Sequence, residues 1–108
     1  MAELDQPTGM GRLEILNGGF EGMSYDLVGE EIVIGRNPTT DITLLDEGIS
    51  REHAVILFDA DAIAYVIEDL QSTNGTKVNG KRIRSAPLNE GDEIQIGQTL
   101  FRFVLSKT

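Results

Sequence analysis

The chain has 108 residues and a net charge of -9 at pH 7, with 40% hydrophobic and 25% charged residues. This length and balance are those of one globular domain, no apolar run is long enough to span a membrane, and the strong acidity disfavours a nucleic-acid partner, because phosphate backbones repel it. Cysteine is absent, which excludes disulfides and thiol catalysis and is compatible with a cytoplasmic protein, the location that we expect.

The elements expected in chain order are short strands. Residues 1–11 lack an apolar pattern and are predicted to be a flexible tail, residues 106–108 a short C-terminal tail, and residues 12–105 the domain. Within the domain, apolar residues alternate over short runs bounded by Gly, Asn and Asp, a pattern typical of strands. The expected strands are Arg12–Leu16, Met23–Val28, Glu31–Ile34, Ile42–Leu45, His53–Phe58, Ala64–Leu70, Lys77–Val78, Lys81–Ile83, Glu93–Ile96 and Leu100–Leu105.

The connections between these strands are tight turns. The pair Asn79-Gly80 favours a type I′ turn, so Lys77–Val78 and Lys81–Ile83 are expected to form a hairpin. No segment keeps a helical period over three turns. Many short strands with regular turn signals predict an all-β protein, either a sandwich or a barrel.

One polar loop, from Asp69 to Gly80, stands out between apolar strands. Its Ser, Thr, Asn and Gly residues offer hydrogen bonds at close range, and compact loops on a rigid sheet often carry recognition. On composition alone, a plain connecting loop is the more common case. Four basic residues lie at the end of this stretch or just after it, namely Lys77, Lys81, Arg82 and Arg84. Such charges usually protect a solvated sheet edge, although local basic spots on an acidic protein also suit a small anion.

Several motifs in the sequence lack the context that their chemistry requires. The stretch from Gly75 to Lys81 has nucleotide-loop spacing, but Arg82 and a strand follow it instead of Ser or Thr and a helix. Asp59 and Asp61 resemble the start of a calcium loop, but Ala64 stands where glycine is required. A single histidine makes a zinc site improbable. We therefore expect neither a metal nor a cofactor.

Ser50, His53 and Asp69 contain the elements of a hydrolase triad. No nucleophile elbow surrounds Ser50, and a histidine three residues from a serine is more often structural than catalytic. A hydrolase is kept as an alternative, and we expect the protein not to be an enzyme.

The remaining pattern suits an anion. Arg36 follows a strand and a glycine, Ser50 and Arg51 lie on a second loop, and Thr73 and Asn74 lie on the polar loop. Arginine supplies a planar fork of donors that fits phosphate oxygens, and hydroxyl and backbone N–H groups add neutral donors. These groups converge only if the three loops share one end of the fold.

Taken together, these residues resemble the forkhead-associated (FHA) domain family. The resemblance covers about Leu13 to Leu105, and the order and spacing of its short motifs are specific. It implies a two-sheet antiparallel β-sandwich whose loops, at one end, bind phosphothreonine in a partner protein. The matching residues are Gly35-Arg36, Ser50-Arg51-Glu52-His53, Asp69-Leu70, Ser72-Thr73-Asn74-Gly75-Thr76, Val78-Asn79-Gly80, Leu88, Gly91-Asp92 and Ile94-Gln95-Ile96-Gly97.

The resemblance also implies roles for the loop residues. Arg36 would contact the phosphate, Ser50 would donate its hydroxyl to it, and Arg51 would help to hold it. Thr73 would line the pocket for the phosphate and the threonine methyl group. Asn74 would bond the peptide backbone and fix its register.

Four further residues have expected roles around this site. Asn79 would touch the peptide further along, and His53 would brace the Ser50 loop from beneath. Gly35 and Gly75 would supply backbone freedom.

The sequence is thus interpreted as a monomeric, non-enzymatic, phosphothreonine-dependent module in kinase-linked signalling or assembly. An FHA-like domain that docks proteins without phosphate, through a sheet face or edge, is the main alternative. Gly48, two residues before Ser50, has no side chain that could contact an acidic residue beside the phosphothreonine. The nearby Asp46, Glu47 and Glu52 would repel such an acidic residue. We therefore hypothesise apolar or basic residues beside the phosphothreonine.

Overall fold

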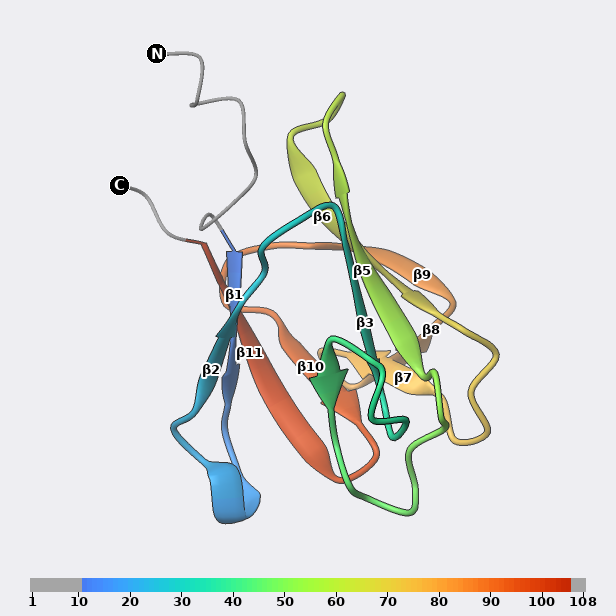
Figure 1. Cartoon of the computed structure of the whole chain (residues 1–108). Helices are drawn as coiled ribbons and strands as arrows, with labels where there is room; N and C mark the ends of the chain where they lie inside the picture. Colours follow the sequence, from blue (N-terminus) through green and yellow to red (C-terminus); the bar gives the residue numbers. More distant parts are fainter. Residues whose placement is uncertain (1–10, 106–108) are drawn as a thin grey trace.

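A computed structural model describes residues 11–105, which form two β-sheets packed face to face (Figure 1). The six-stranded sheet has the order β2-β1-β11-β10-β7-β8, and the five-stranded sheet has the order β4-β3-β5-β6-β9. The elements are β1 (Gly11–Ile15), η2 (Gly18–Phe20, a 3-10 turn), β2 (Ser24–Asp26), β3 (Glu31–Gly35), β4 (Ile42–Thr43), β5 (Ala54–Asp59), β6 (Ala64–Asp69), β7 (Thr76–Val78), β8 (Lys81–Ile83), β9 (Ser85–Leu88), β10 (Glu93–Ile96) and β11 (Thr99–Leu105).

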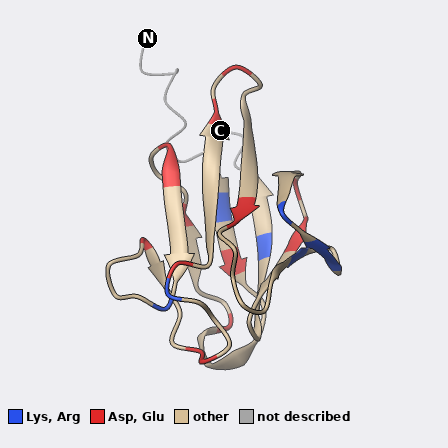
Figure 2. Cartoon of the chain, turned by 90° about the vertical axis from the view of Figure 1, so that its right-hand side faces the viewer, with Lys and Arg blue, Asp and Glu red and all other residues tan. Residues whose placement is uncertain are grey.

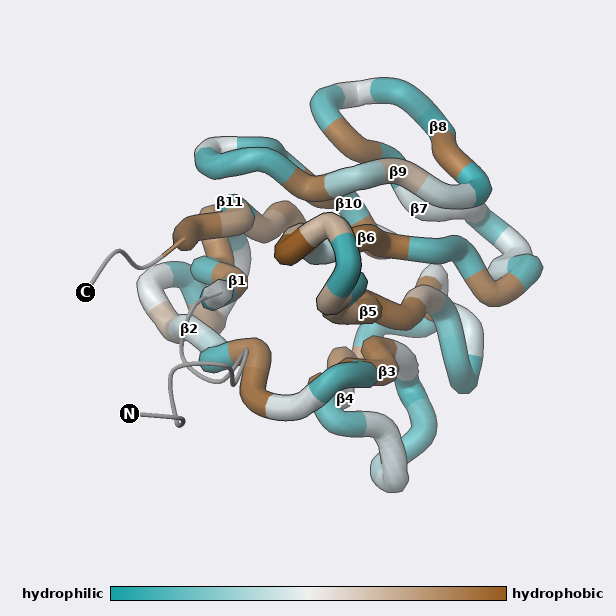
Figure 3. Tube along the Cα trace, turned by 90° about the horizontal axis from the view of Figure 1, so that it is seen from above, coloured by the Kyte–Doolittle hydropathy of each residue, from teal (hydrophilic) through white to brown (hydrophobic). Residues whose placement is uncertain are grey.

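The core lies between the sheets because alternate residues of most strands are apolar. Viewed from above, hydrophobic residues recur along strands of both sheets (Figure 3). Tyr65 of β6 meets Phe103 of β11 edge to face, with ring centroids 5.5 Å apart, so one contact joins the two layers. The large apolar side chains buried most fully are Phe101, Phe103, Leu13, Leu27, Ile34, Ile49, Ile56, Ile67, Ile94 and Ile96.

The predicted all-β sandwich is confirmed, but one strand pair is parallel. After β3 the chain doubles back, the Asp41 carboxylate accepts a hydrogen bond from the Val33 N–H at 2.8 Å, and β4 then runs beside β3 with Ile34 opposite Ile42. A parallel pair usually needs a long crossover. Here β4 is only two residues long, so the short loop suffices. The five-stranded sheet is therefore mixed at this edge, whereas its other strand pairs and those of the six-stranded sheet are antiparallel, as expected.

The boundaries of several predicted strands change in the structure. Strand β9, which the sequence did not predict, contains Pro87 and lies at a sheet edge, the place where a residue without an N–H is tolerated. Gly11, assigned to the tail, begins β1 and pairs with Leu105. The remaining tail residues, 1–10 and 106–108, lie outside the described residues. Between residues 11 and 105 no helix is long and apolar enough to cross a membrane.

The predicted hairpin turn between β7 and β8 is confirmed. Asn79 and Gly80 have φ angles of 52° and 84°. Positive φ at both central positions defines a type I′ turn, whose twist matches that of the flanking strands. The two strands joined by this turn carry three of the basic residues, Lys77 on β7 and Lys81 and Arg82 on β8.

Candidate functional site

Three loops meet at one end of the sandwich (Figure 1, lower right). They are the β3–β4 loop with Arg36, the β4–β5 loop with Ser50 and the β6–β7 loop with Thr73 and Asn74. Together they form a depression of about 140 Å³ lined by Arg36, Glu47, Gly48, Ile49, Ser50, Thr73 and Asn74.

Arg36 is held by the backbone of the neighbouring loop. Its N–H donates to the Ser50 carbonyl at 3.0 Å, and its Nε donates to the Ile49 carbonyl at 2.9 Å. The two terminal nitrogens of the guanidinium therefore remain to bind a ligand. Gly35 makes this approach possible, because a Cβ there would collide with the Arg51 carbonyl.

His53 ties the Ser50 loop to the polar loop. The imidazole is completely buried, and its Nε2 lies 2.9 Å from the Gly75 carbonyl oxygen. A carbonyl only accepts, so Nε2 carries the proton and donates it, and Nδ1 accepts the Ser50 N–H at 3.1 Å. Both ring nitrogens are thereby used in fixing two loops.

Ser50 and Asn74 complete the contact between the loops. The Ser50 Oγ accepts the Thr73 N–H at 3.0 Å, which leaves the hydroxyl proton to be donated to a ligand. The Asn74 Nδ2 donates to the Gly48 carbonyl at 2.9 Å, which leaves the Asn74 Oδ1 as an acceptor. The depression thus presents donors from Arg36 and Ser50 beside an amide that can bond a peptide backbone.

The polar loop is shaped by Asp69, a residue to which the sequence assigned no part in the binding site. The Asp69 Oδ1 accepts the Ser72 hydroxyl at 2.5 Å and the Thr76 hydroxyl at 2.7 Å, and the Ser72 Oγ accepts the Gly75 N–H at 2.9 Å. Burial raises the pKa of Asp69, but the hydroxyl bonds from Ser72 and Thr76 outweigh it, and the net pKa is lowered. The carboxylate is therefore charged and fully engaged.

Asp46 fixes the loop that carries Gly48 and Ser50. Its carboxylate accepts the Gly48 N–H at 2.8 Å through Oδ1 and the Gln98 N–H at 2.8 Å through Oδ2. These bonds, first the one from Gly48 and then the one from Gln98, lower the pKa of Asp46. An Asp two residues before a Gly is a turn signal that sequence analysis could have used.

Two of the expected site residues lie outside the depression. Arg51 is exposed and does not line it. The Asn79 side chain is used in its own turn, since its Nδ2 donates to Asp92 at 3.0 Å and its Oδ1 accepts the Glu93 N–H at 3.0 Å. The structure thus brings together Arg36, Ser50, Thr73 and Asn74, but it does not add these two residues to the same surface.

The geometry of a hydrolase triad is not formed. The Ser50 Oγ bonds Thr73, both nitrogens of His53 bond the backbone, and the Asp69 carboxylate bonds Ser72 and Thr76. No histidine nitrogen is left to accept the serine proton. Over residues 11–105, no three His, Asp or Glu side chains gather as a metal ion would need.

The chain matches the family model for the FHA domain over residues 32–97 and belongs to that family. It is 41% identical over 107 residues to the transcriptional regulatory protein EmbR of Mycobacterium tuberculosis. The matched region covers 95% of this chain and 27% of EmbR. It is 40% identical over 98 residues to the oxoglutarate dehydrogenase inhibitor of Corynebacterium jeikeium, covering 91% of this chain and 65% of that protein. The chain therefore spans about a quarter of EmbR and about two thirds of the inhibitor.

The solved structures that the chain resembles include FHA domains and a longer protein. The structure of M. tuberculosis EmbR in complex with a low-affinity phosphopeptide has a TM-score of 0.83 at 37% identity, over 99% of this chain and 29% of that one. An FHA domain solved in a study of phosphothreonine-dependent interactions also has a TM-score of 0.83, at 30% identity over 92% and 99% of the two chains. The predicted family is confirmed.

Proposed function

We propose that this domain binds a phosphothreonine-bearing segment of a partner protein and catalyses no reaction. The observation that carries the proposal is the convergence of Arg36, Ser50, Thr73 and Asn74, from three loops, on one depression. The similarity to EmbR, which was solved with a phosphopeptide, supports it. The domain would act as a monomer in the cytoplasm, within kinase-linked signalling or assembly.

The chemistry of the depression suits a phosphate. A phosphothreonine carries about -1.5 to -2 charges at neutral pH and three strong acceptor oxygens. Arg36 forms no ion pair with Glu47 or any other residue between 11 and 105, so its guanidinium is open to an incoming anion. Charge-assisted hydrogen bonds contribute about 1.5–3 kcal/mol each. Three of them contribute about 4.5–9 kcal/mol together. Further contacts with the peptide would have to offset the cost of association for binding to reach the micromolar range, about -8 kcal/mol.

The preference for threonine over serine would come from the apolar side of the depression. Thr73 is exposed and lines the depression. Its methyl carbon would offer a contact for the methyl group that phosphothreonine has and phosphoserine lacks. Burying one such group contributes about 0.8 kcal/mol, or roughly fourfold in affinity.

Calorimetric titration with matched peptides tests this function. Each peptide is prepared with phosphothreonine, with phosphoserine and without phosphate at the same position. We expect measurable binding only for the phosphorylated forms, and tightest binding for phosphothreonine. Equal binding of the unmodified peptide would overturn the proposal in favour of the phosphate-independent docking domain. Turnover of an acyl or phosphate ester that Ser50→Ala abolishes would instead favour a hydrolase.

A further inference from the structure

The hairpin formed by β7, β8 and the residue after it is the basic part of an acidic protein. Lys77, Lys81, Arg82 and Arg84 are four of the nine Lys and Arg residues in a chain of net charge -9. All four are exposed. Lys and Arg segments accordingly gather on the projecting hairpin at the right of Figure 2. Such a concentration of one sign makes a local attractive field for anions.

None of these four cations is paired within the described part of the chain. Across residues 11–105, an ion pair joins Arg12 and Glu14, and no side-chain hydrogen bond involves the four basic residues. Glu68 and Asp69 line the same cavity as Arg82 and Arg84. Neither carboxylate forms an ion pair with either arginine, and the Asp69 carboxylate bonds the Ser72 and Thr76 hydroxyls. The guanidinium groups therefore keep their N–H donors for a ligand, although the two carboxylates balance their charge at the cavity.

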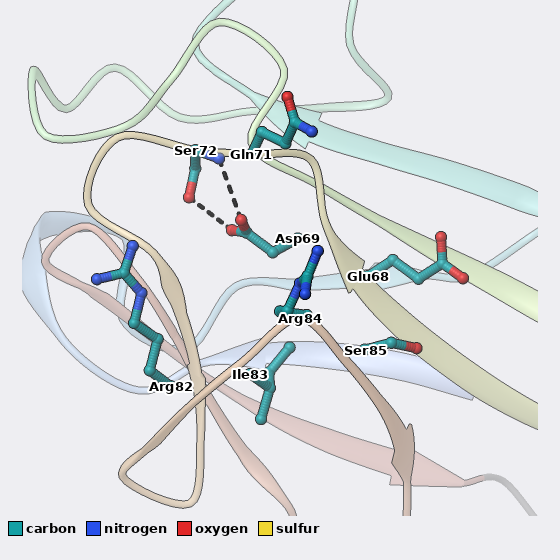
Figure 4. A pocket seen from close by; sticks show the side chains of 8 residues that line it. All are labelled: Glu68, Asp69, Gln71, Ser72, Arg82, Ile83, Arg84 and Ser85. Carbon is teal, nitrogen blue, oxygen red and sulfur yellow. Dashed lines mark hydrogen bonds between the residues drawn. The ribbon is translucent and has the colours of Figure 1, made fainter.

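Arg82 and Arg84 stand at a cavity of about 720 Å³ behind the polar loop. In Figure 4 both guanidinium groups rise from the β8 side toward the loop that carries Ser72, with Ile83 between their bases. The fork of donors on each arginine fits the oxygens of a carboxylate or a phosphate. The cavity is lined by Glu68, Asp69, Gln71, Ser72, Arg82, Ile83, Arg84 and Ser85.

This cavity and the phosphothreonine depression share one wall. Ser72 lines the cavity, and the next two residues, Thr73 and Asn74, line the depression. Arg82 reaches the same loop, because a Cβ built on Gly75 would lie 2.5 Å from the Arg82 Nε. An extended peptide advances about 3.3 Å per residue. Because consecutive residues of one loop line the two sites, a partner seated in the depression can reach the cavity within a few residues.

The two sides of the polar loop differ in charge. Asp46 and Glu47 lie on the side of the Gly48 loop. On the side of the hairpin, Arg82 and Arg84 balance Glu68 and Asp69 at the cavity, and the hairpin adds Lys77 and Lys81. The sequence favoured apolar or basic residues on both flanks of the phosphothreonine. The structure restricts that argument to one flank, because the cavity beside the basic hairpin borders the other.

We propose that the cavity beside the basic hairpin is a second anion subsite, which receives an acidic or phosphorylated side chain of the same partner that places its phosphothreonine at Arg36 and Ser50. The proposal rests on the proposed function. The alternative is that the four charges only protect an edge, since β8 ends the six-stranded sheet. Edge protection predicts no dependence of peptide affinity on Arg82 or Arg84, and a subsite requires one.

Peptide titrations against wild type and a double variant, Arg82→Gln/Arg84→Gln, decide between these cases. A neutral phosphothreonine peptide is the reference. Further peptides carry a glutamate pair or a second phosphothreonine a few positions before or after the first. The matched control is Arg102→Gln, which removes an exposed arginine from β11. Thermal unfolding verifies that every variant is folded.

We expect acidic residues on one flank of the phosphothreonine, but not on the other, to raise the peptide affinity of the wild-type domain about 2- to 30-fold. This is the effect of two exposed charge pairs, and it should be smaller at high salt. The double variant should lose this gain and still bind the neutral peptide, and Arg102→Gln should keep both. The glutamate and diphosphorylated peptides separate carboxylate from phosphate as the preferred anion.

Two results would overturn the subsite. The first is that the neutral phosphothreonine peptide binds but acidic residues on either flank do not raise its affinity. This result would leave the proposed function intact. The other is arginine-dependent binding of duplex DNA or anionic vesicles with no gain for acidic peptides. Absence of binding to every phosphothreonine peptide would instead overturn the proposed function, and the subsite with it.

Discussion

The Ser50 Oγ accepts the backbone N–H of Thr73 at 3.0 Å, although the two residues are 23 positions apart. This bond orients the serine hydroxyl, because one lone pair is occupied and the proton is left to point elsewhere. It also sets the distance between two of the three loops. The binding surface therefore exists before any ligand arrives, which reduces the ordering cost of binding.

Replacing Arg36 by alanine should abolish most phosphothreonine binding. The variant loses the two terminal nitrogens that face the depression and keeps the fold, because Arg36 is exposed. A loss of about 1.5–3 kcal/mol corresponds to roughly 10- to 150-fold in Kd. Calorimetry with one phosphothreonine peptide measures it. Arg102→Ala, at an exposed site on β11, is the control. Affinity within a factor of about two of wild type in Arg36→Ala would contradict the site.

Replacing Asn79 by glycine should lower stability and leave peptide affinity unchanged. Its side chain bonds Asp92 and the Glu93 N–H, so its loss should cost about 1 kcal/mol. Glycine is the substitute because the φ of 52° would strain alanine. Urea unfolding and peptide titration on the same samples separate the two effects. A clear drop in affinity would restore the expected peptide contact.

Replacing Gly35 by alanine should destabilise the domain by about 1–3 kcal/mol. The added methyl group would collide with the Arg51 carbonyl, and that carbonyl already accepts the Asn37 N–H, so the backbone cannot withdraw easily. Gly48→Ala is the matched control, because a Cβ there would meet its nearest atom at 3.5 Å, an ordinary contact. Equal unfolding midpoints for the two variants would show that the close approach at Gly35 is unimportant.

The domain should lose stability in acid through Asp69. Burial raises the pKa of this carboxyl, but the Ser72 and Thr76 hydroxyl bonds outweigh that effect and lower it. A folded pKa below the unfolded value means that the stabilisation is complete above the ordinary aspartate pKa of about 3.9 and is lost as pH falls through the folded pKa.

Unfolding measured from neutral pH to about pH 2 tests this expectation. Asp69→Asn should be less stable than wild type near neutrality and should show a shallower loss in acid. Asp61→Asn, at an exposed site, is the control and should follow the wild-type profile. Parallel profiles for wild type and Asp69→Asn would mean that other carboxyls, such as Asp46, cause the acid transition.

The sequence by itself determined the local structure of this protein. Alternation such as Phe101 and Phe103 predicted strands because one face of a strand must be buried. Asn79-Gly80 predicted its turn because few other pairs accept positive φ. The order of short motifs identified the family and, with it, Arg36, Ser50, Thr73 and Asn74.

Only the tertiary structure decided which of these residues meet. Hydrogen bonds such as those of His53 to Ser50 and Gly75 join segments that composition cannot connect. The parallel course of β4, the engagement of Asn79 in its own turn and the common wall of the two cavities depend on how the chain folds back on itself. Local propensity acts over a few residues, whereas a binding site is defined by distances between loops far apart in sequence.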